Sequence, residues 1–206
     1  MKRNYDTIAW FYDRLARLIF GTTLVNAQLF LIRAIPPMSR ILIVGGGTGW
    51  ILEEIAKLHQ SGLTITYIDA SKKMIGLAQQ RNTGNNQIEF ISTPIEAVSL
   101  AQAYDIVLTP FLFDNFSQDS LSKMFDQLSG VMKPRGLWLY ADFQATGIAW
   151  QRLVLKIMYM FFRVSCGIEA THLPDAKSLF TEHNFTNQTQ RSFMNQFIIA
   201  VVYQKA

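Results

Sequence analysis

Five short apolar runs, separated by amphipathic segments, constrain the fold of this chain more than any other feature of its sequence. The runs are ILIV (41–44), LTITYI (63–68), IEFI (88–91), DIVLT (105–109) and LWLYA (137–141). Each gap between consecutive runs is long enough for a crossover helix, and apolar residues recur in the gaps at helical spacing. This alternation predicts an α/β fold, a doubly wound and mostly parallel sheet covered by helices on both faces.

The two ends of the chain depart from this alternation. Residues 5–33 are dense in apolar and aromatic residues at helical spacing, and paired prolines follow at 36 and 37. At the other end, FTNQTQRSF and FIIAVVYQ are strand-like runs joined only by MNQ, a connection that permits only an antiparallel hairpin. We expect one domain with four parts. These are a helical cap (1–34), a cofactor-binding core (35–143), a helical lid or insertion (144–184) and a C-terminal β-hairpin (185–206).

Composition excludes several classes of protein. Half of the 206 residues are hydrophobic, which is ample for a core, and the net charge of +4 is scattered along the chain. A nucleic-acid-binding protein would more often show a basic stripe, so no nucleic-acid partner is expected. Cys166 is the only cysteine and the three histidines lack ligand spacing, so we expect neither a disulfide nor a metal site.

Charged residues also argue against secretion and membrane insertion. They interrupt the N-terminal twenty residues, which removes the apolar core of a signal peptide. The most apolar segment, 153–164, is too short to span a bilayer and contains Lys156 and Arg163. We therefore expect a cytoplasmic protein, a monomer or homodimer, for which weak association with a membrane surface stays open.

The stretch ILIVGGGTGW (41–50) predicts a ligand-binding loop. An apolar run leads into Gly45, Gly46, Gly47 and Gly49, and a helical pattern follows. Glycine permits positive φ and close approach of a ligand to the backbone, and a helix N-terminus offers free N–H groups. A plain turn is the alternative. The order strand, loop, helix favours ligand binding, because ligands of open α/β sheets lie at the carboxyl ends of the strands.

Spacing separates two classes of cofactor. A dinucleotide site has the pattern G-x-G-x-x-G, which would place its third glycine at Trp50, so the sequence argues against a nicotinamide oxidoreductase. The observed pattern is G-x-G-x-G. Asp69 ends the second apolar run, where a carboxylate can accept hydrogen bonds from both hydroxyls of a ribose. Capping of the helix that follows Ser71 is the alternative role for Asp69.

With these residues in place, the chain resembles a class I S-adenosylmethionine-dependent methyltransferase. ILIVGGGTGWILEEI resembles the first motif of that family, and IDASKKMIGLA, YDIVLTPFLFDNF and MKPRGLWLYADF resemble its second, fourth and fifth strand segments. The resemblance covers residues 41–143. It implies S-adenosylmethionine as cofactor and a seven-stranded Rossmann-like sheet with an antiparallel last strand.

The resemblance also assigns site residues. It places Asp69 on the ribose and Met74 near the adenine. The front of the chain is similar to the N-terminal helix of quinone-biosynthesis-type and other small-molecule methyltransferases, with Tyr12 closing over the cofactor. Further cofactor contacts are expected at Ala70, Pro94, Ile95 and Thr109. Two departures from the family pattern predict weaker cofactor binding, because Ile43 and Pro94 occupy positions where the family often has acidic residues.

The acceptor side of the site is less defined by sequence. Asp114, in the loop after the fourth strand, is a candidate to orient a nucleophile or take a proton, and His172 is a second candidate base. Each has an ordinary structural role as its alternative. The apolar segment 144–170 predicts a lid and hence a small hydrophobic or aromatic acceptor. An RNA or protein methyltransferase and a non-catalytic cofactor-binding relative are the alternative functions.

Overall fold

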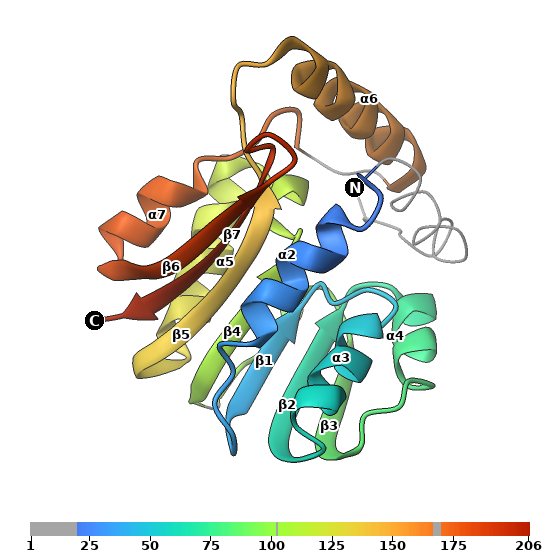
Figure 1. Cartoon of the computed structure of the whole chain (residues 1–206), viewed down its shortest axis with the longest axis vertical. Coiled ribbons are helices and arrows are strands. Elements are labelled where there is room, and N and C mark those ends of the chain that lie inside the picture. The colour runs from blue at the N-terminus through green and yellow to red at the C-terminus, as the bar shows by residue number, and fades with distance from the viewer. Residues whose placement is uncertain (1–19, 102, 167–169) are drawn as a thin grey trace.

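The computed structural model describes residues 20–101, 103–166 and 170–206 (Figure 1). The predicted N-terminal helix therefore falls partly outside the described residues, as does Tyr12 entirely. Within them, α2 spans Thr23–Ile32. It ends before the prolines at 36 and 37, as the sequence predicts.

The sheet has the predicted composition and topology. Its strands are β1 (Arg40–Val44), β2 (Ser61–Asp69), β3 (Asn85–Ser92), β4 (Tyr104–Pro110), β5 (Met132–Phe143), β6 (Phe185–Phe193) and β7 (Ile198–Lys205). They lie in the order β3-β2-β1-β4-β5-β7-β6. β1 to β5 run parallel to one another, and β7 runs antiparallel to both β5 and β6. The seven-stranded α/β fold and the C-terminal hairpin are thus confirmed.

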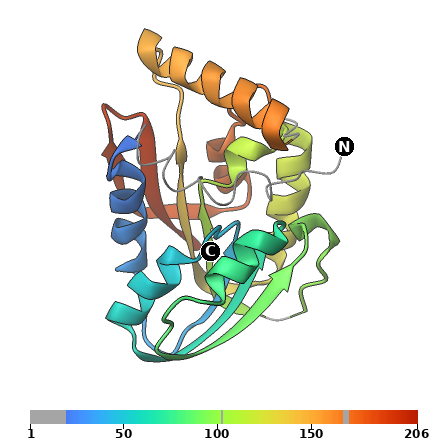
Figure 2. The ribbon, with the colours of Figure 1, turned by 90° about the vertical axis from the view of Figure 1, so that its right-hand side faces the viewer.

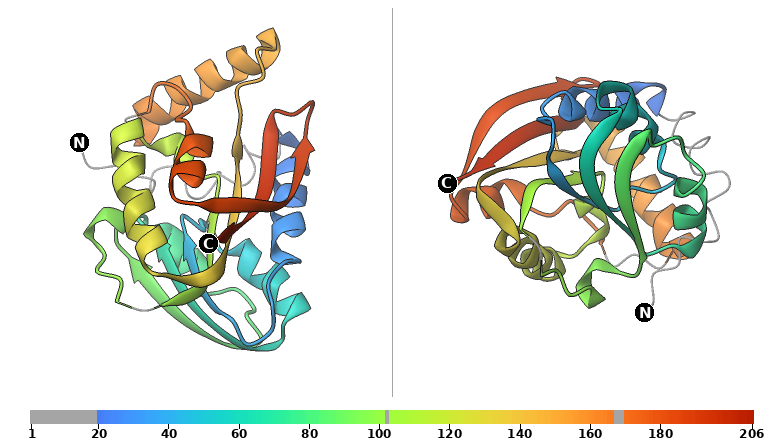
Figure 3. Two further views of the ribbon diagram at one scale, coloured as in Figure 1. Left: turned by 90° about the vertical axis from the view of Figure 1, so that its left-hand side faces the viewer. Right: turned by 90° about the horizontal axis from the view of Figure 1, so that it is seen from below.

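Alternation along each central strand divides the core into two layers. In β1, Ile41 and Ile43 face one layer while Leu42 and Val44 face the other. The first layer is covered by α2, α3 (Trp50–Leu58) and α4 (Lys72–Ala78). The second is covered by α5 (Gln118–Gly130) and α7 (Ala176–Glu182), on the side of the sheet opposite α2 in Figure 3. Both faces of the parallel strands are therefore buried, which explains their continuous apolar runs.

Two serines cap the N-termini of helices. The Ser71 hydroxyl accepts a hydrogen bond from the N–H of Met74, and that of Ser117 accepts one from the N–H of Ser120. α5 ends at Gly130, and Pro134 and Gly136 lie within β5.

One helix lies apart from the two layers. α6 (Ala149–Cys166) crosses beyond the carboxyl ends of the parallel strands instead of covering a face of the sheet (Figures 1 and 2). The predicted lid region 144–184 thus contains two different elements. Only α6 has the position of a lid, because α7 packs against the sheet through Ala176, Leu179 and Phe180.

Aromatic side chains dominate the layer under α5 and α7. The ring of Phe180 packs edge-on to those of Phe125, Trp138 and Phe185, with centroids 4.9–5.6 Å apart, and stacks on Tyr203 at 3.9 Å. Phe180 is 1% exposed. This cluster fixes α7 and the hairpin to the parallel part of the sheet.

We expect Phe180→Ala to destabilise the fold without altering the ligand site. Truncating a buried phenylalanine lowers the free energy of unfolding by about 3–5 kcal/mol, because the ring leaves a cavity. Urea unfolding followed by circular dichroism measures the change. Lys177→Ala, an exposed substitution on the same helix, is the control, and equal stability of the two variants would contradict the role given to the cluster.

Candidate active site

A single large cavity opens at the carboxyl edge of the parallel strands. Its volume is about 890 Å³, and its lining comes from the loop after β1, the ends of β2 and β4, and the helices α2 and α6. Most sequence-predicted site residues line it together. These are Gly45, Gly46, Gly47, Asp69, Ala70, Met74, Pro94, Ile95 and Asp114. A site at this edge is where the topology of an open α/β sheet places one.

The glycines of the loop after β1 serve two purposes. A side chain at Gly45 would meet Leu112, one at Gly46 would meet the ring of Tyr67, and one at Gly49 would meet the backbone of Ala78 at 2.6 Å. These three are therefore required by packing within the protein. Gly47 differs, because no atom of the described residues lies within 4 Å of the position a Cβ would take; its φ of +65° is positive, as it is at Gly45 and Gly49. The open space beside the loop is at Gly47, which also lines the cavity.

Asp69 ties the end of β2 to this loop. Its Oδ2 accepts a hydrogen bond of 2.9 Å from the N–H of Gly47, and its Oδ1 accepts one of 2.9 Å from the N–H of Ser71. The side chain is 9% exposed and lines the cavity. These two hydrogen bonds orient the carboxylate at the edge of the cavity. Ser71, and not Asp69, caps α4, whereas Asp69 braces the loop and lines the cavity. Its contact with a ribose stays a prediction.

Three predicted site residues lie away from the cavity. The hydroxyl of Thr109 is buried and accepts a hydrogen bond of 2.9 Å from Nε1 of Trp138, which argues against the expected cofactor contact. Gly49 packs on α4 and does not contribute to the lining. His172 is exposed, lies within hydrogen-bond distance of the hydroxyl of its neighbour Thr171, and does not line the cavity. Ile43, the first departure from the family pattern, lies in the buried core of β1.

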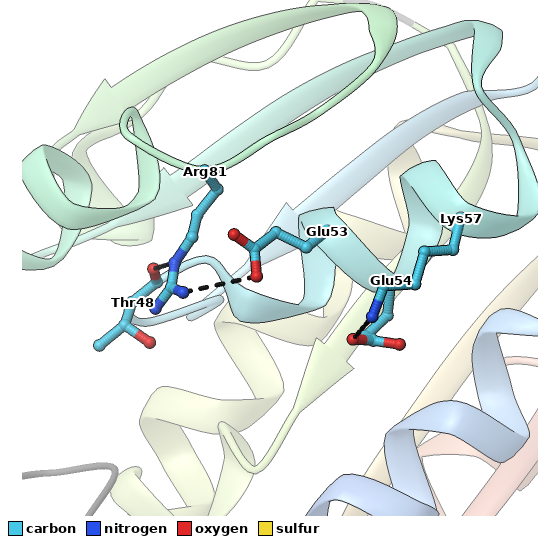
Figure 4. Close-up of polar contacts among 5 residues, drawn as sticks. All are labelled: Thr48, Glu53, Glu54, Lys57 and Arg81. Atoms are coloured by element: carbon cyan, nitrogen blue, oxygen red, sulfur yellow. Dashed lines mark hydrogen bonds and ion pairs between the residues drawn. The ribbon is translucent and has the colours of Figure 1, made fainter.

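Arg81 holds the start of α3 from the segment after α4 (Figure 4). Its Nε donates a hydrogen bond of 3.0 Å to the carbonyl of Thr48, and its guanidinium lies 3.5 Å from the carboxylate of Glu53. The neighbouring Glu54 pairs instead with Lys57 at 2.6 Å. Arg81 also lines the cavity. Sequence reasoning missed this residue, because it stands in a polar turn without a recognisable motif.

A second missed residue, Asp142, lies at the end of β5. Its side chain is 1% exposed and accepts hydrogen bonds from the N–H groups of Phe113 (2.9 Å), Asp114 (3.3 Å) and Phe143 (2.8 Å). It thereby holds the short helical turn η3 (Phe113–Asn115) against the sheet. Asp114 itself is half-buried and lines the cavity. The available signal was a carboxylate within the otherwise apolar run LWLYADF.

Burial changes the protonation of this acid pair. Loss of solvent raises the pKa of Asp142 from 3.8 to about 7, against the effect of its three backbone donors. Burial, followed by the nearby charge of Asp142, raises the pKa of Asp114 well above its usual value. Tyr159 of α6 belongs to the same neighbourhood, since burial and then both carboxylates raise its pKa. The Tyr159 hydroxyl is buried and has no hydrogen-bond partner among the described residues.

Sheet order, glycine loop and cavity together define a Rossmann-like methyltransferase fold. A family model described as a methyltransferase domain matches residues 41–136. The chain is 30% identical over 169 residues to the ubiquinone/menaquinone biosynthesis C-methyltransferase of Geotalea daltonii. This match covers 79% of the chain and 69% of that relative. The chain belongs to the class I S-adenosylmethionine-dependent methyltransferases.

Two further similarities agree with this assignment. A malonyl-[acyl-carrier protein] O-methyltransferase of Halalkalibacterium halodurans is 31% identical over 107 residues, and the match spans 50% of the chain but only 38% of that relative. The crystal structure of magnesium protoporphyrin IX methyltransferase from Synechocystis PCC 6803 with bound S-adenosylhomocysteine has a TM-score of 0.68 at 18% identity. That match covers 95% of this chain and 88% of the other.

The cavity fits the family's cofactor in two respects. No atom of the described residues fills the space beside the backbone of Gly47, and the Asp69 carboxylate lines the cavity next to it. Pro94 and Ile95 contribute an apolar wall. Among the described residues, no group of three His, Cys, Asp or Glu side chains is placed to hold a metal ion.

We expect Asp69→Ala to weaken binding of S-adenosylmethionine by more than tenfold. Loss of hydrogen bonds to a charged group costs roughly 1.5–3 kcal/mol, and the loop also loses its brace at Gly47. Isothermal titration calorimetry measures the dissociation constant. Asp69→Asn, which keeps one acceptor oxygen, should fall between wild type and Asp69→Ala, and Asp119→Ala on exposed α5 surface is the control. Unchanged affinity in Asp69→Ala would contradict the role of this carboxylate.

The raised pKa of Asp142 predicts how stability depends on pH. Between about pH 4 and about pH 7 the folded state binds more protons at this carboxyl than the unfolded chain does. The free energy of unfolding therefore falls as pH rises through this window, by at most about 1.4 kcal/mol per pH unit from this group, and levels off above it.

Asp142→Asn tests this dependence, because the amide does not titrate. Urea unfolding of wild type and variant across the window should show a shallower decline in the variant, so that its relative stability improves as pH rises. A constant difference between the two proteins at every pH would show that Asp142 keeps an ordinary pKa.

Proposed function

We propose that this chain transfers a methyl group from S-adenosylmethionine to a small hydrophobic or aromatic acceptor. One observation carries the proposal. The same cavity joins Gly47 and Asp69 at one end to the aromatic side chains of Phe111, Phe143, Phe161 and Phe162. A cofactor and an apolar acceptor can therefore meet in one space, from which water is largely displaced.

The residues of the chain have separate tasks in this proposal. When bound, S-adenosylmethionine supplies a methyl group that is already activated for in-line displacement. Asp69 accepts hydrogen bonds from the ribose, while Met74, Pro94 and Ile95 pack against the base. Alignment and exclusion of water are then the main contributions of the protein, and they can supply several kcal/mol.

Asp114 is the proposed contact with the acceptor. It lines the cavity from the turn after β4, and the Nδ2 of Asn115 donates to its Oδ1 at 2.7 Å. Its raised pKa favours the protonated form more than in water, and the protonated carboxyl can donate a hydrogen bond to an acceptor oxygen; once ionised, the group can accept a proton. Asp142 positions Asp114 through the backbone of η3.

The names of the relatives agree with an acceptor of this kind. The Geotalea daltonii relative is named for ubiquinone and menaquinone biosynthesis, and quinone rings are flat and apolar. The Halalkalibacterium halodurans relative is named for a malonyl group on a carrier protein. The apolar lining of the cavity under α6 favours the first class of acceptor for this chain.

Methyl transfer from radiolabelled S-adenosylmethionine to a panel of phenols, quinols and fatty acyl acceptors tests the proposal. We expect transfer to at least one aromatic member. Transfer to RNA or protein but to no member of the panel would favour the alternative enzyme class. Cofactor binding without transfer to any acceptor would identify a non-catalytic relative.

Asp114→Asn should lower kcat by roughly 100-fold or more, as expected for loss of a proton-transfer or orienting group. Its dissociation constant for S-adenosylmethionine should stay within about twofold of wild type, because Asp114 is assigned to the acceptor. Asp119→Asn, five residues further along on exposed surface, is the matched control. Equal losses of cofactor binding and turnover would instead place Asp114 on the cofactor.

A further inference from the structure

The outward face of α6 exposes apolar side chains that a lid does not require. Eight large hydrophobic side chains of the described residues are exposed, and five of them lie within residues 148–160. Four are on α6 itself: Trp150 (37% exposed), Leu153 (59%), Ile157 (51%) and Met160 (65%). We call these four residues the apolar stripe.

The spacing of the stripe makes it continuous. Its members are separated by three, four and three residues, so they follow one side of the helix at roughly 100° per residue. The opposite side is already occupied. Met158, Phe161 and Phe162 line the cavity, while Val154 and Leu155 pack on the core. α6 is thus apolar both toward the protein and toward the outside.

A row of cations runs along one edge of the stripe. Arg152, Lys156 and Arg163 are exposed, and their spacing of four and seven residues places them on one side of the helix. α6 contains no aspartate or glutamate. None of the three cations forms an ion pair with another described residue, unlike Lys57, Arg81 and Lys133 elsewhere on the surface.

We propose that the outward face of α6 docks on an anionic lipid membrane surface. The apolar stripe enters the boundary between headgroups and acyl chains, and the three cations meet anionic headgroups. The helix lies along the surface, and no described helix has the length and apolar content to cross a bilayer. Charge favours lipid over a second copy of the chain, because a two-fold pairing through α6 would gather six positive charges at one interface.

The docking face adjoins the cavity. Ile157 is half exposed in the stripe and also contributes to the cavity lining, next to Met158. A bilayer against the outward face of α6 would therefore lie beside the cavity. An acceptor dissolved in that bilayer could enter the cavity without crossing water. This last step rests on the proposed function, whereas docking itself does not.

Co-sedimentation with vesicles tests docking. Wild-type protein is mixed with vesicles of equal parts phosphatidylglycerol and phosphatidylcholine, or of phosphatidylcholine alone. We expect binding to the anionic vesicles that weakens as salt is added. Arg152→Gln, Lys156→Gln and Arg163→Gln together should reduce partitioning on the order of 100-fold at low salt, since each cation contributes about 1 kcal/mol.

The stripe has its own variant. Leu153→Gln with Met160→Gln removes two exposed apolar side chains that do not line the cavity, and should reduce partitioning at least tenfold. Each variant has a matched control at exposed positions elsewhere. The control for the stripe is Leu58→Gln with Met38→Gln. The control for the cations removes three other positive charges, by Lys72→Gln, Lys123→Gln and Lys177→Gln.

Several results would overturn the proposal. They are absence of wild-type binding to anionic vesicles at low salt, equal binding to neutral vesicles, and equal loss in the variants and their controls. A further contrary result can come from sedimentation equilibrium without lipid. A wild-type dimer that Leu153→Gln with Met160→Gln converts to monomer would assign the stripe to a second copy. Failure of the proposed function would look different, because methyl transfer would be absent while vesicle binding persisted.

Discussion

The hydrogen bond from the N–H of Gly47 to the carboxylate of Asp69 is the contact on which the site depends. It joins the loop after β1 to the end of β2, and a second bond from the N–H of Gly45 to the carbonyl of Ile68 holds the same junction. These two bonds restrain the backbone of the loop without any ligand. A ligand at Gly47 meets backbone fixed by two neighbouring strands, so little ordering has to accompany its binding.

The surrounding glycines show how tightly this junction is built. Tyr67 fills the space at Gly46 and donates from its hydroxyl to the carbonyl of Gly47 at 3.1 Å. α4 fills the space at Gly49. The missing side chains at Gly46 and Gly49 let β2 and α4 pack against the loop. At Gly47 the missing side chain leaves room for a ligand among the described residues. Arg81 adds a clamp on the carbonyl of Thr48.

Strand positions and the residues that end strands could be predicted from the sequence, because both depend on local patterns. Alternation located β1 to β5, the short MNQ connection located the hairpin, and Asp69 followed from its place at the end of an apolar run. Contacts between distant residues could not be predicted. Thr109 is bonded to Trp138, 29 residues away, and Asp142 holds a turn 28 and 29 residues before it. A local sequence pattern does not predict which loop will lie against the end of a given strand.

The acid pair and α6 form one physical system at the far end of the cavity. Loss of solvent raises the pKa of both carboxyls, and the nearby charge of Asp142 raises that of Asp114 further, so protonation is easier here than in water. The buried Tyr159 hydroxyl brings an unpaired donor to this region from α6, and such a group costs free energy unless a partner is found. One side of α6 therefore lies in the electrostatic neighbourhood of the acid pair, and another side carries its exposed apolar residues.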